Sequence, residues 1–298
     1  MANEQNHDFL MERLLRQMNP DLHKRFTDAV FSLQHVLTNY KMIFPEYTDH
    51  TSLHTLTVID FCNRLIGDQI GRLNADELYA LLMGCYLHDT GMGITMKDYE
   101  AFSRRIDFGT YFDTHSRDDL PAIIRDFHHE YSGQFIREYA YVFEIPSGEH
   151  EQAIIQIARG HRRTDLMDEQ EYPLEHRVPG GNTICLPYLA ALIRLADEID
   201  VAAARNPVLL YDIEALTDEI EIVENKKVLA VRSLQMSESA FILIVSTPEE
   251  DILEEIRKMV GKMQRTLDCC RAAVNGRTPY VITQEKVLLE VQNDPTGE

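Results

Sequence analysis

The chain has 298 residues, of which 44% are hydrophobic and 26% are charged, proportions typical of a globular protein. Its formal net charge is −20, and because so acidic a surface repels polyanions, long nucleic acids are excluded as partners. No run of about 18 apolar residues is present, so we expect no membrane association. The polar first residues predict no secretory signal.

The five cysteines form no pair with the spacing of a metal-binding motif. An odd number of free thiols is typical of a reducing compartment, so we expect a cytoplasmic protein. An oligomer is compatible with this composition, although no segment of the sequence specifies one.

Apolar residues recur with the period of an amphipathic helix through the first two hundred positions, which predicts a succession of helices. Asn74 and Glu77 have the spacing of a capping box at the start of one of them. The expected helices lie at about 9–18, 26–33, 53–65, 74–90, 96–105, 127–143, 147–161 and 184–204. The fold class is therefore mainly α, a helical bundle.

The pattern changes after Asn206 and Pro207. Alternating apolar residues and turn-forming residues replace the helical period and predict strands, followed by one long capped helix. The predicted elements are a hairpin of Glu219–Val223 with Val228–Ser233, a strand Phe241–Ser246, a helix opened by a capping box at Thr247–Glu250 and running to about Val274, and short strands at Tyr280–Ile282 and Val287–Val291.

Two domains follow from this change of pattern. We expect residues 1–206 to form a helical metal-binding domain whose motifs lie in residues 47–200. Residues 207–298 are expected to form a small α+β domain.

A histidine or an aspartate lies on the apolar face of each of several predicted helices, at intervals of 33 to 39 residues. Taken singly, such a histidine is more often a satisfied core residue than a ligand. Together, however, buried imidazoles and carboxylates are costly unless paired or ligated, so their convergence predicts a metal site. The members are His54, His88, Asp89, His128, His161 and Asp197.

These residues lie in motifs that resemble the successive motifs of HD-domain phosphohydrolases, over roughly residues 40–205. The motifs are Tyr47-Thr48-Asp49-His50 followed by His54, Leu87-His88-Asp89-Thr90-Gly91, His128-His129-Glu130-Tyr131-Ser132, Gly160-His161-Arg162 and Leu195-Ala196-Asp197.

The resemblance implies one or two divalent ions, with Mn, Fe, Zn, Ni and Co as candidates and Mg also compatible. It implies that one ion is held by the first histidine, the HD pair and the last aspartate, and a second by two further histidines with a bridging Asp89. His129 competes with His128, which we prefer because it lies four residues before Ser132. The implied ligands are His54, His88, Asp89 and Asp197 for the first ion, and His128, His161 and Asp89 for the second.

Two adjacent ions lower the pKa of a shared water towards about 7, which supplies a hydroxide nucleophile. We therefore expect hydrolysis of a phosphomonoester or phosphodiester bond in a small nucleotide-like substrate. Arginines are suited to bidentate contacts with phosphate. The expected catalytic residues are Asp89, Arg162 and Arg163, and the expected substrate contacts are His50, Lys97, Arg104 and Arg105.

Other functions remain open at this point. The cyclic di-nucleotide branch of the family that the motifs resemble has a lysine after its HD-x-G motif and a Gly-Tyr-Pro signature. This chain has Met92 after Gly91 and Glu171-Tyr172-Pro173 in place of the signature, which disfavours cyclic di-GMP as substrate. The alternatives are a non-catalytic ligand sensor or scaffold, and a di-iron oxygenase built on the same ligands.

Overall fold

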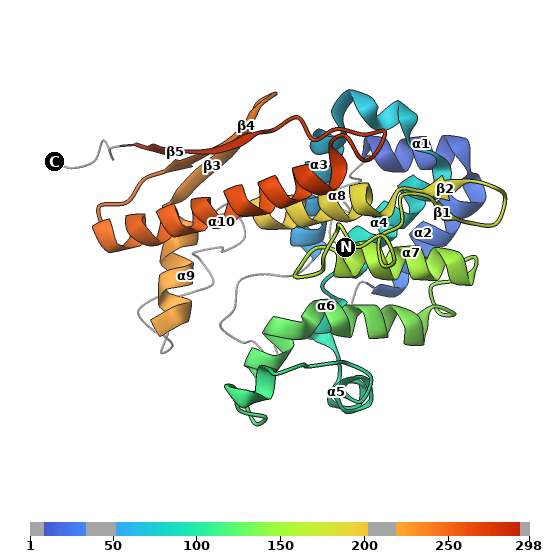
Figure 1. Cartoon of the computed structure of the whole chain (residues 1–298), viewed down its shortest axis with the longest axis horizontal. Coiled ribbons are helices and arrows are strands. Elements are labelled where there is room, and N and C mark those ends of the chain that lie inside the picture. The colour runs from blue at the N-terminus through green and yellow to red at the C-terminus, as the bar shows by residue number, and fades with distance from the viewer. Residues whose placement is uncertain (1–8, 34–51, 202–218, 293–298) are drawn as a thin grey trace, which may run out of the picture.

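The computed structural model describes residues 9–33, 52–201 and 219–292. These residues form a mainly helical molecule with small sheets, so the predicted fold class is confirmed (Figure 1). None of the helices described is long and apolar enough to cross a membrane. The helices are α1 (Leu10–Met18), α2 (Pro20–Leu33), α3 (Ser52–Ile66), α4 (Ala75–Leu87), α5 (Met96–Ser103), α6 (Leu120–Tyr139), α7 (Gly148–Arg159), α8 (Leu186–Ile199), α9 (Glu219–Ala230) and α10 (Glu250–Val274).

Helix α4 is the central element of the bundle. Almost all of its side chains are buried, and it packs against α1, α2, α3, α7 and α8. Its N-terminus has the predicted capping box, in which Asn74 accepts from the backbone of Glu77 at 3.1 Å and Glu77 accepts from the backbone of Asn74 at 3.0 Å. Because α4 is capped and enclosed, its C-terminal end delivers His88 and Asp89 to the interior.

The chain after α4 passes very close to α6. A Cβ atom at Gly91 would lie 2.1 Å from the carbonyl oxygen of His128, so only glycine fits there. The backbone N–H of Gly91 donates to the Ser132 hydroxyl at 2.8 Å, and that hydroxyl donates to the carbonyl of His88 at 2.5 Å. This contact holds the end of α4 against the turn of α6 that carries His128.

The C-terminal strands are β3 (Val231–Met236), β4 (Ala240–Val245) and β5 (Lys286–Val291), and a small ribbon of β1 (His176–Arg177) and β2 (Thr183–Ile184) precedes α8. Strand β4 pairs antiparallel with β3 and parallel with β5, and α10 connects the two parallel strands. Helix α10 also lies along α8 (Figure 1), where Met263, Leu267 and Cys270 join the hydrophobic core of the bundle.

The hairpin predicted for Glu219–Val223 and Val228–Ser233 is wrong. Residues 219–230 form α9, and the observed hairpin is β3 with β4. Helix α9 packs against α10 and has an internal ion pair between Lys227 and Glu224 at 2.7 Å. Packing of this kind overrides the strand preference of alternating β-branched residues. The strands predicted at Phe241–Ser246 and Val287–Val291 are confirmed as β4 and β5.

Two further local predictions are corrected. Helix α10 begins at Glu250 with Glu249 as its N-cap, because the Thr247 hydroxyl accepts from the backbone of Glu249 and does not cap a helix there. Residues 280–282 form no strand. The boundary predicted near residue 206 lies outside the described residues and stays a prediction.

Candidate metal centre

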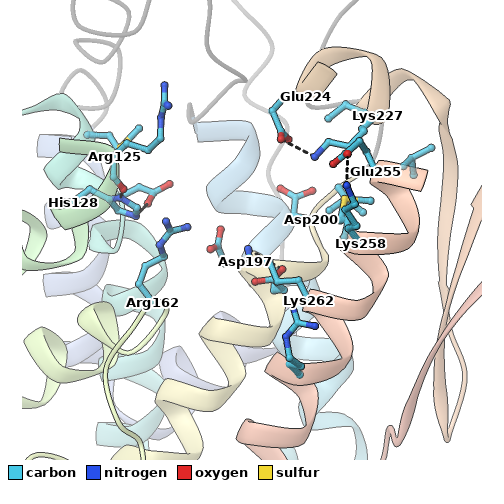
Figure 2. A pocket seen from close by; sticks show the side chains of 18 residues that line it. Arg125, His128, Arg162, Asp197, Asp200, Glu224, Lys227, Glu255, Lys258 and Lys262 are labelled. Atoms are coloured by element: carbon cyan, nitrogen blue, oxygen red, sulfur yellow. Dashed lines mark hydrogen bonds and ion pairs between the residues drawn. The ribbon is translucent and has the colours of Figure 1, made fainter. Parts of the chain in front are cut away.

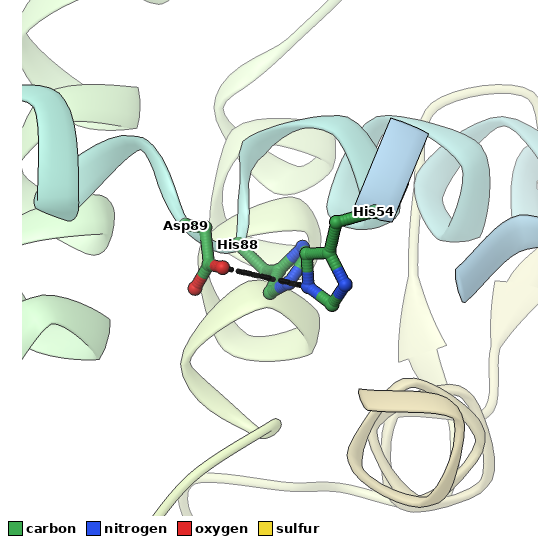
Figure 3. Close-up of side chains that lie close together, drawn as sticks. All are labelled: His54, His88 and Asp89. Carbon is green, nitrogen blue, oxygen red and sulfur yellow. Dashed lines mark hydrogen bonds and ion pairs between the residues drawn. The ribbon is translucent and has the colours of Figure 1, made fainter. Parts of the chain in front are cut away.

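Five helices bring the predicted histidines and aspartates together. His54 projects from α3, while His88 and Asp89 follow the end of α4 (Figure 3). His128 lies on α6, and His161 follows α7. We define the first group as His54, His88 and Asp89, and the second group as Asp89, His128 and His161. Within each group, the possible ligand atoms lie within 4.8 Å of one another, and all of these residues are buried.

Asp89 belongs to both groups because its two carboxylate oxygens point in different directions. Its Oδ2 atom lies 3.5 Å from Nε2 of His54 and 3.5 Å from Nε2 of His88. Its Oδ1 atom lies 3.5 Å from Nε2 of His128 and 3.7 Å from Nε2 of His161. One carboxylate therefore faces two pairs of imidazoles, which is the arrangement of a bridging ligand.

The hydrogen bond made by Nδ1 fixes the tautomer of three of these histidines. Nδ1 of His88 donates to the carbonyl of Cys85, and Nδ1 of His128 donates to the carbonyl of Arg125, both at 2.8 Å. Nδ1 of His161 donates in the same way to the carbonyl of Ala158. A carbonyl can only accept, so Nδ1 carries the proton and the neutral ring presents Nε2 as a lone pair.

These lone pairs face each other at short range. Nε2 of His54 lies 3.2 Å from Nε2 of His88, and Nε2 of His128 lies 2.9 Å from Nε2 of His161. Two unprotonated nitrogens cannot satisfy each other by a hydrogen bond, and leaving them buried without a partner is costly. A cation between them removes the conflict, so the donor set fits divalent metal ions.

The histidines of the second group are held neutral. Burial, and then the neighbouring His88, lower the pKa of His161 to about 3. Burial and then the positive charge of Arg162 lower the pKa of His128 well below its ordinary value. Neutral imidazole is the form that ligates metals, so both rings are in the ligating state at neutral pH.

Two aspartates, one on α8 and one at its C-terminal end, lie beside the first group. Asp197, predicted at the first ion, has its Oδ1 atom 3.3 Å from Nε2 of His54 and 4.0 Å from Nε2 of His88. Asp200 was not predicted from the sequence. Its buried carboxylate accepts from Nδ1 of His54 at 2.6 Å and so orients that ring. The sequence feature that could have pointed to Asp200 is its position one helical turn after Asp197.

The structure places His128, and not His129, in the second group. His129 is also buried, but its Nε2 atom lies 3.6 Å from the carboxylate of Glu130, and its ring centroid is 6.4 Å from that of His161. The two adjacent rings are nearly perpendicular, at 85°. The preference for His128, made on its spacing to Ser132, agrees with this geometry.

A cleft of about 460 Å³ opens beside the two groups, and Asp89, His128 and Asp197 are among the residues that line it (Figure 2). Arg162 lines this cleft, as predicted. Arg125, which the sequence did not single out, lines it as well. The opposite wall comes from α9 and α10, whose basic residues were also missed because no motif connects them to the histidines.

Four predicted basic residues are not brought to the cleft. Arg163 is 63% exposed and pairs with Asp126 at 2.9 Å, so of these two adjacent arginines only Arg162 lines the cleft. Lys97, Arg104 and Arg105 belong to α5 and the turn after it, where all three are exposed, and Arg105 pairs with Glu138 of α6. Helix α5 packs on α6 away from the cleft lining, which is why these cations do not reach it.

His50, the remaining predicted substrate contact, lies outside the described residues.

The comparison with known families agrees with this site. The HD-CE family model matches residues 44–275, a span that contains every residue of both groups as well as α9 and α10. No curated protein matches the chain.

Proposed function

The chain belongs to the HD-CE family, and on that premise we propose that it is a metal-dependent phosphohydrolase that hydrolyses a phosphomonoester or phosphodiester bond of a small nucleotide-like substrate. The observation that carries the proposal is the position of Asp89, which directs one carboxylate oxygen to each of two histidine pairs. A single metal needs only one of these pairs. Two pairs sharing one carboxylate support a two-metal site.

The residues that would hold the ions follow from the distances. His54, His88, Asp89 and Asp197 would hold one ion, and Asp89, His128 and His161 the other. Mixed nitrogen and oxygen donors suit Mn, Fe, Zn, Ni or Co, and Mg is also compatible. Bound there, two such ions would lower the pKa of a water molecule and take up negative charge on the phosphoryl group.

The protein itself contributes orientation and charge. Asp200 and three backbone carbonyls each fix one imidazole, so the four rings need no reorganisation to ligate. Arg162 lines the cleft beside His128 and makes no ion pair with any described residue, which leaves its guanidinium to contact a phosphoryl oxygen. The partly enclosed cleft limits the water around the reacting bond.

The test is the metal content per chain, measured by elemental mass spectrometry on protein purified without added metal, beside Asp89→Ala. We expect one to two equivalents of transition metal in the wild type and loss of most of it in the variant, since one substitution removes a ligand from both ions. Metal-loaded protein should then turn over at least one member of a phosphoester panel, and the variant should be slower by about a thousandfold or more.

The outcomes separate the three functions considered. Absence of metal even after reconstitution would overturn the catalytic proposal. Tight metal binding without turnover of any phosphoester would favour the ligand sensor or scaffold. Iron with consumption of dioxygen would favour the oxygenase.

A further inference from the structure

The cleft has a higher share of basic residues than the protein as a whole. Six of its eighteen lining residues are lysine or arginine and six are aspartate or glutamate, whereas the whole chain has 29 basic residues and 49 acidic ones among 298. In a molecule with a formal charge of −20, this balance lowers the local barrier to an anion. Helices α9 and α10 supply four of the six: Lys227, Lys258, Lys262 and Arg265.

These cations stand apart from the arginines of the bundle. Figure 2 shows Arg125, His128 and Arg162 on one side of the cleft, and Lys227, Lys258 and Lys262 on the other. Asp197 and Asp200 lie between the two sides. A phosphoryl group at the histidines is thus flanked by the bundle arginines, and the lysines face a different part of the same cleft.

The basic residues of α10 share one face of the helix. Lys258, Lys262 and Arg265 follow each other at intervals of four and three residues, which aligns their side chains along the cleft. Arg257, adjacent in sequence, lies on another face and pairs with Glu250 and Glu254 instead. We define the α10 anion face as Lys258, Lys262 and Arg265.

The α10 anion face can exchange its present partners for a ligand. Lys258 pairs with Glu255 at 2.7 Å, and the two side chains are 63% and 39% exposed. An ion pair so exposed contributes little, so a doubly charged phosphate can replace the Glu255 carboxylate at small cost. Lys262 pairs with Glu198 at 3.1 Å, and because the Glu198 side chain is only 16% exposed, exchange costs more there. Arg265 makes no side-chain hydrogen bond or ion pair with residues in the described ranges, and its guanidinium suits bidentate phosphate contacts.

We propose that the α10 anion face binds a second anionic group of the substrate, so that the substrate is a small molecule with two separated phosphate groups. One group is cleaved at the histidines, and the other is held by α10. The cleft, at about 460 Å³, has the size of a site for a whole small molecule. This inference rests on the proposed function for the cleavage step, but the anion contact itself needs no metal.

The first test is therefore made on metal-free protein. Inorganic pyrophosphate is titrated into the chelator-treated full chain by calorimetry, for the wild type, the double variant Lys258→Gln with Arg265→Gln, and the control Arg257→Gln. Charge-assisted contacts predict that the double variant binds pyrophosphate about tenfold more weakly, with the control unchanged. Undetectable binding by the wild type, an unchanged double variant, or an equal loss in the control would each overturn the inference. Circular dichroism checks that the variants are folded.

The second test uses metal-loaded protein and compares a diol bisphosphate with the alkyl monophosphate of the same chain length. The wild type should prefer the bisphosphate in kcat/KM, and the double variant should lose about tenfold of this preference, whereas Arg257→Gln should keep it. A wild type without preference would overturn the inference even if both esters are hydrolysed. Pyrophosphate binding at α10 in a protein that takes up no metal even after reconstitution would instead overturn only the proposed function.

Discussion

The polar side chains of the two walls of the cleft differ in burial and in the kind of partner they have. On the bundle side, His54, His88 and His161 are at most 3% exposed, and each uses Nδ1 in an internal hydrogen bond. Their Nε2 atoms lie beside other possible ligand atoms. On the α10 side, Lys258 and Lys262 are more than half exposed, and each has a carboxylate partner.

This difference separates the side proposed to carry out the reaction, which is buried, from the side proposed to select the substrate, which is exposed. A buried group of lone pairs is costly without its ion, because the rings cannot rotate to find other partners without losing their Nδ1 bonds. Substitutions there should therefore have large effects. Solvated lysines exchange partners freely, so substitutions on α10 should leave the fold intact and change only what the cleft binds.

After Asp89→Ala, the largest expected effect comes from His161→Ala, which breaks the second group and leaves the first intact. We expect the metal content to fall by about one equivalent and phosphoester turnover to fall by about a hundredfold or more, since the removed ring faces both Asp89 and His128. Elemental analysis and single-turnover kinetics measure both effects. His129→Gln is the matched control, and an equal loss of metal there would contradict the assignment of His128 to this group.

A smaller effect is expected for Asp200→Ala, which removes the carboxylate that orients His54. Metal affinity should fall by about tenfold to a hundredfold, as measured by competition with a chromogenic chelator. Asp200→Asn keeps an acceptor for Nδ1 and should recover part of the affinity. Asp60→Ala, an exposed position on α3, should have no effect; a similar loss there would show that the change is not specific.

A third substitution tests the buried contact between the C-terminal segment and the bundle. The Tyr280 hydroxyl donates to the Glu77 carboxylate at 3.0 Å, and its ring stacks on Tyr188 with centroids 4.1 Å apart. Tyr280→Phe should lower the free energy of unfolding by about 1–3 kcal/mol, measured in urea, because a buried carboxylate loses a donor. Tyr141→Phe, at an exposed tyrosine, should leave it unchanged.

The same contact predicts a pH dependence. Burial raises the pKa of Glu77 above its ordinary value, while the Tyr280 hydrogen bond lowers it. The native state therefore holds this proton more tightly than the unfolded state, so stability falls as the pH rises through the raised pKa. Tyr280→Phe should extend that fall to higher pH, and Glu77→Gln should abolish this contribution. Identical pH profiles for all three proteins would contradict the assignment.

The smallest effect is expected for Lys258→Gln on the α10 anion face. Its pair with Glu255 lies in solvent, so thermal unfolding should be indistinguishable from that of the wild type. A clearly lower unfolding midpoint would mean that this pair stabilises the fold, and that the two walls differ less than their exposure implies.

The sequence by itself determined the helices of the bundle and the buried histidines and aspartates that they carry. Helical period, the Asn74 capping box and the position of each histidine on an apolar face are local properties, and they survive folding because burying that face is what forms the bundle. The sequence could also favour His128 over His129, since a spacing of four residues to Ser132 selects one face of α6.

Only the tertiary structure decided which other side chains meet these ligands. Asp200 contacts His54 across 146 positions, and the α10 cations face the cleft because α10 packs along α8. Local pattern assigned residues 219–223 to a strand, whereas packing against α10 makes them part of α9. Contacts between segments so distant in the chain leave no local period in the sequence, and exposed lysines resemble any solvated surface until the fold places them opposite a site.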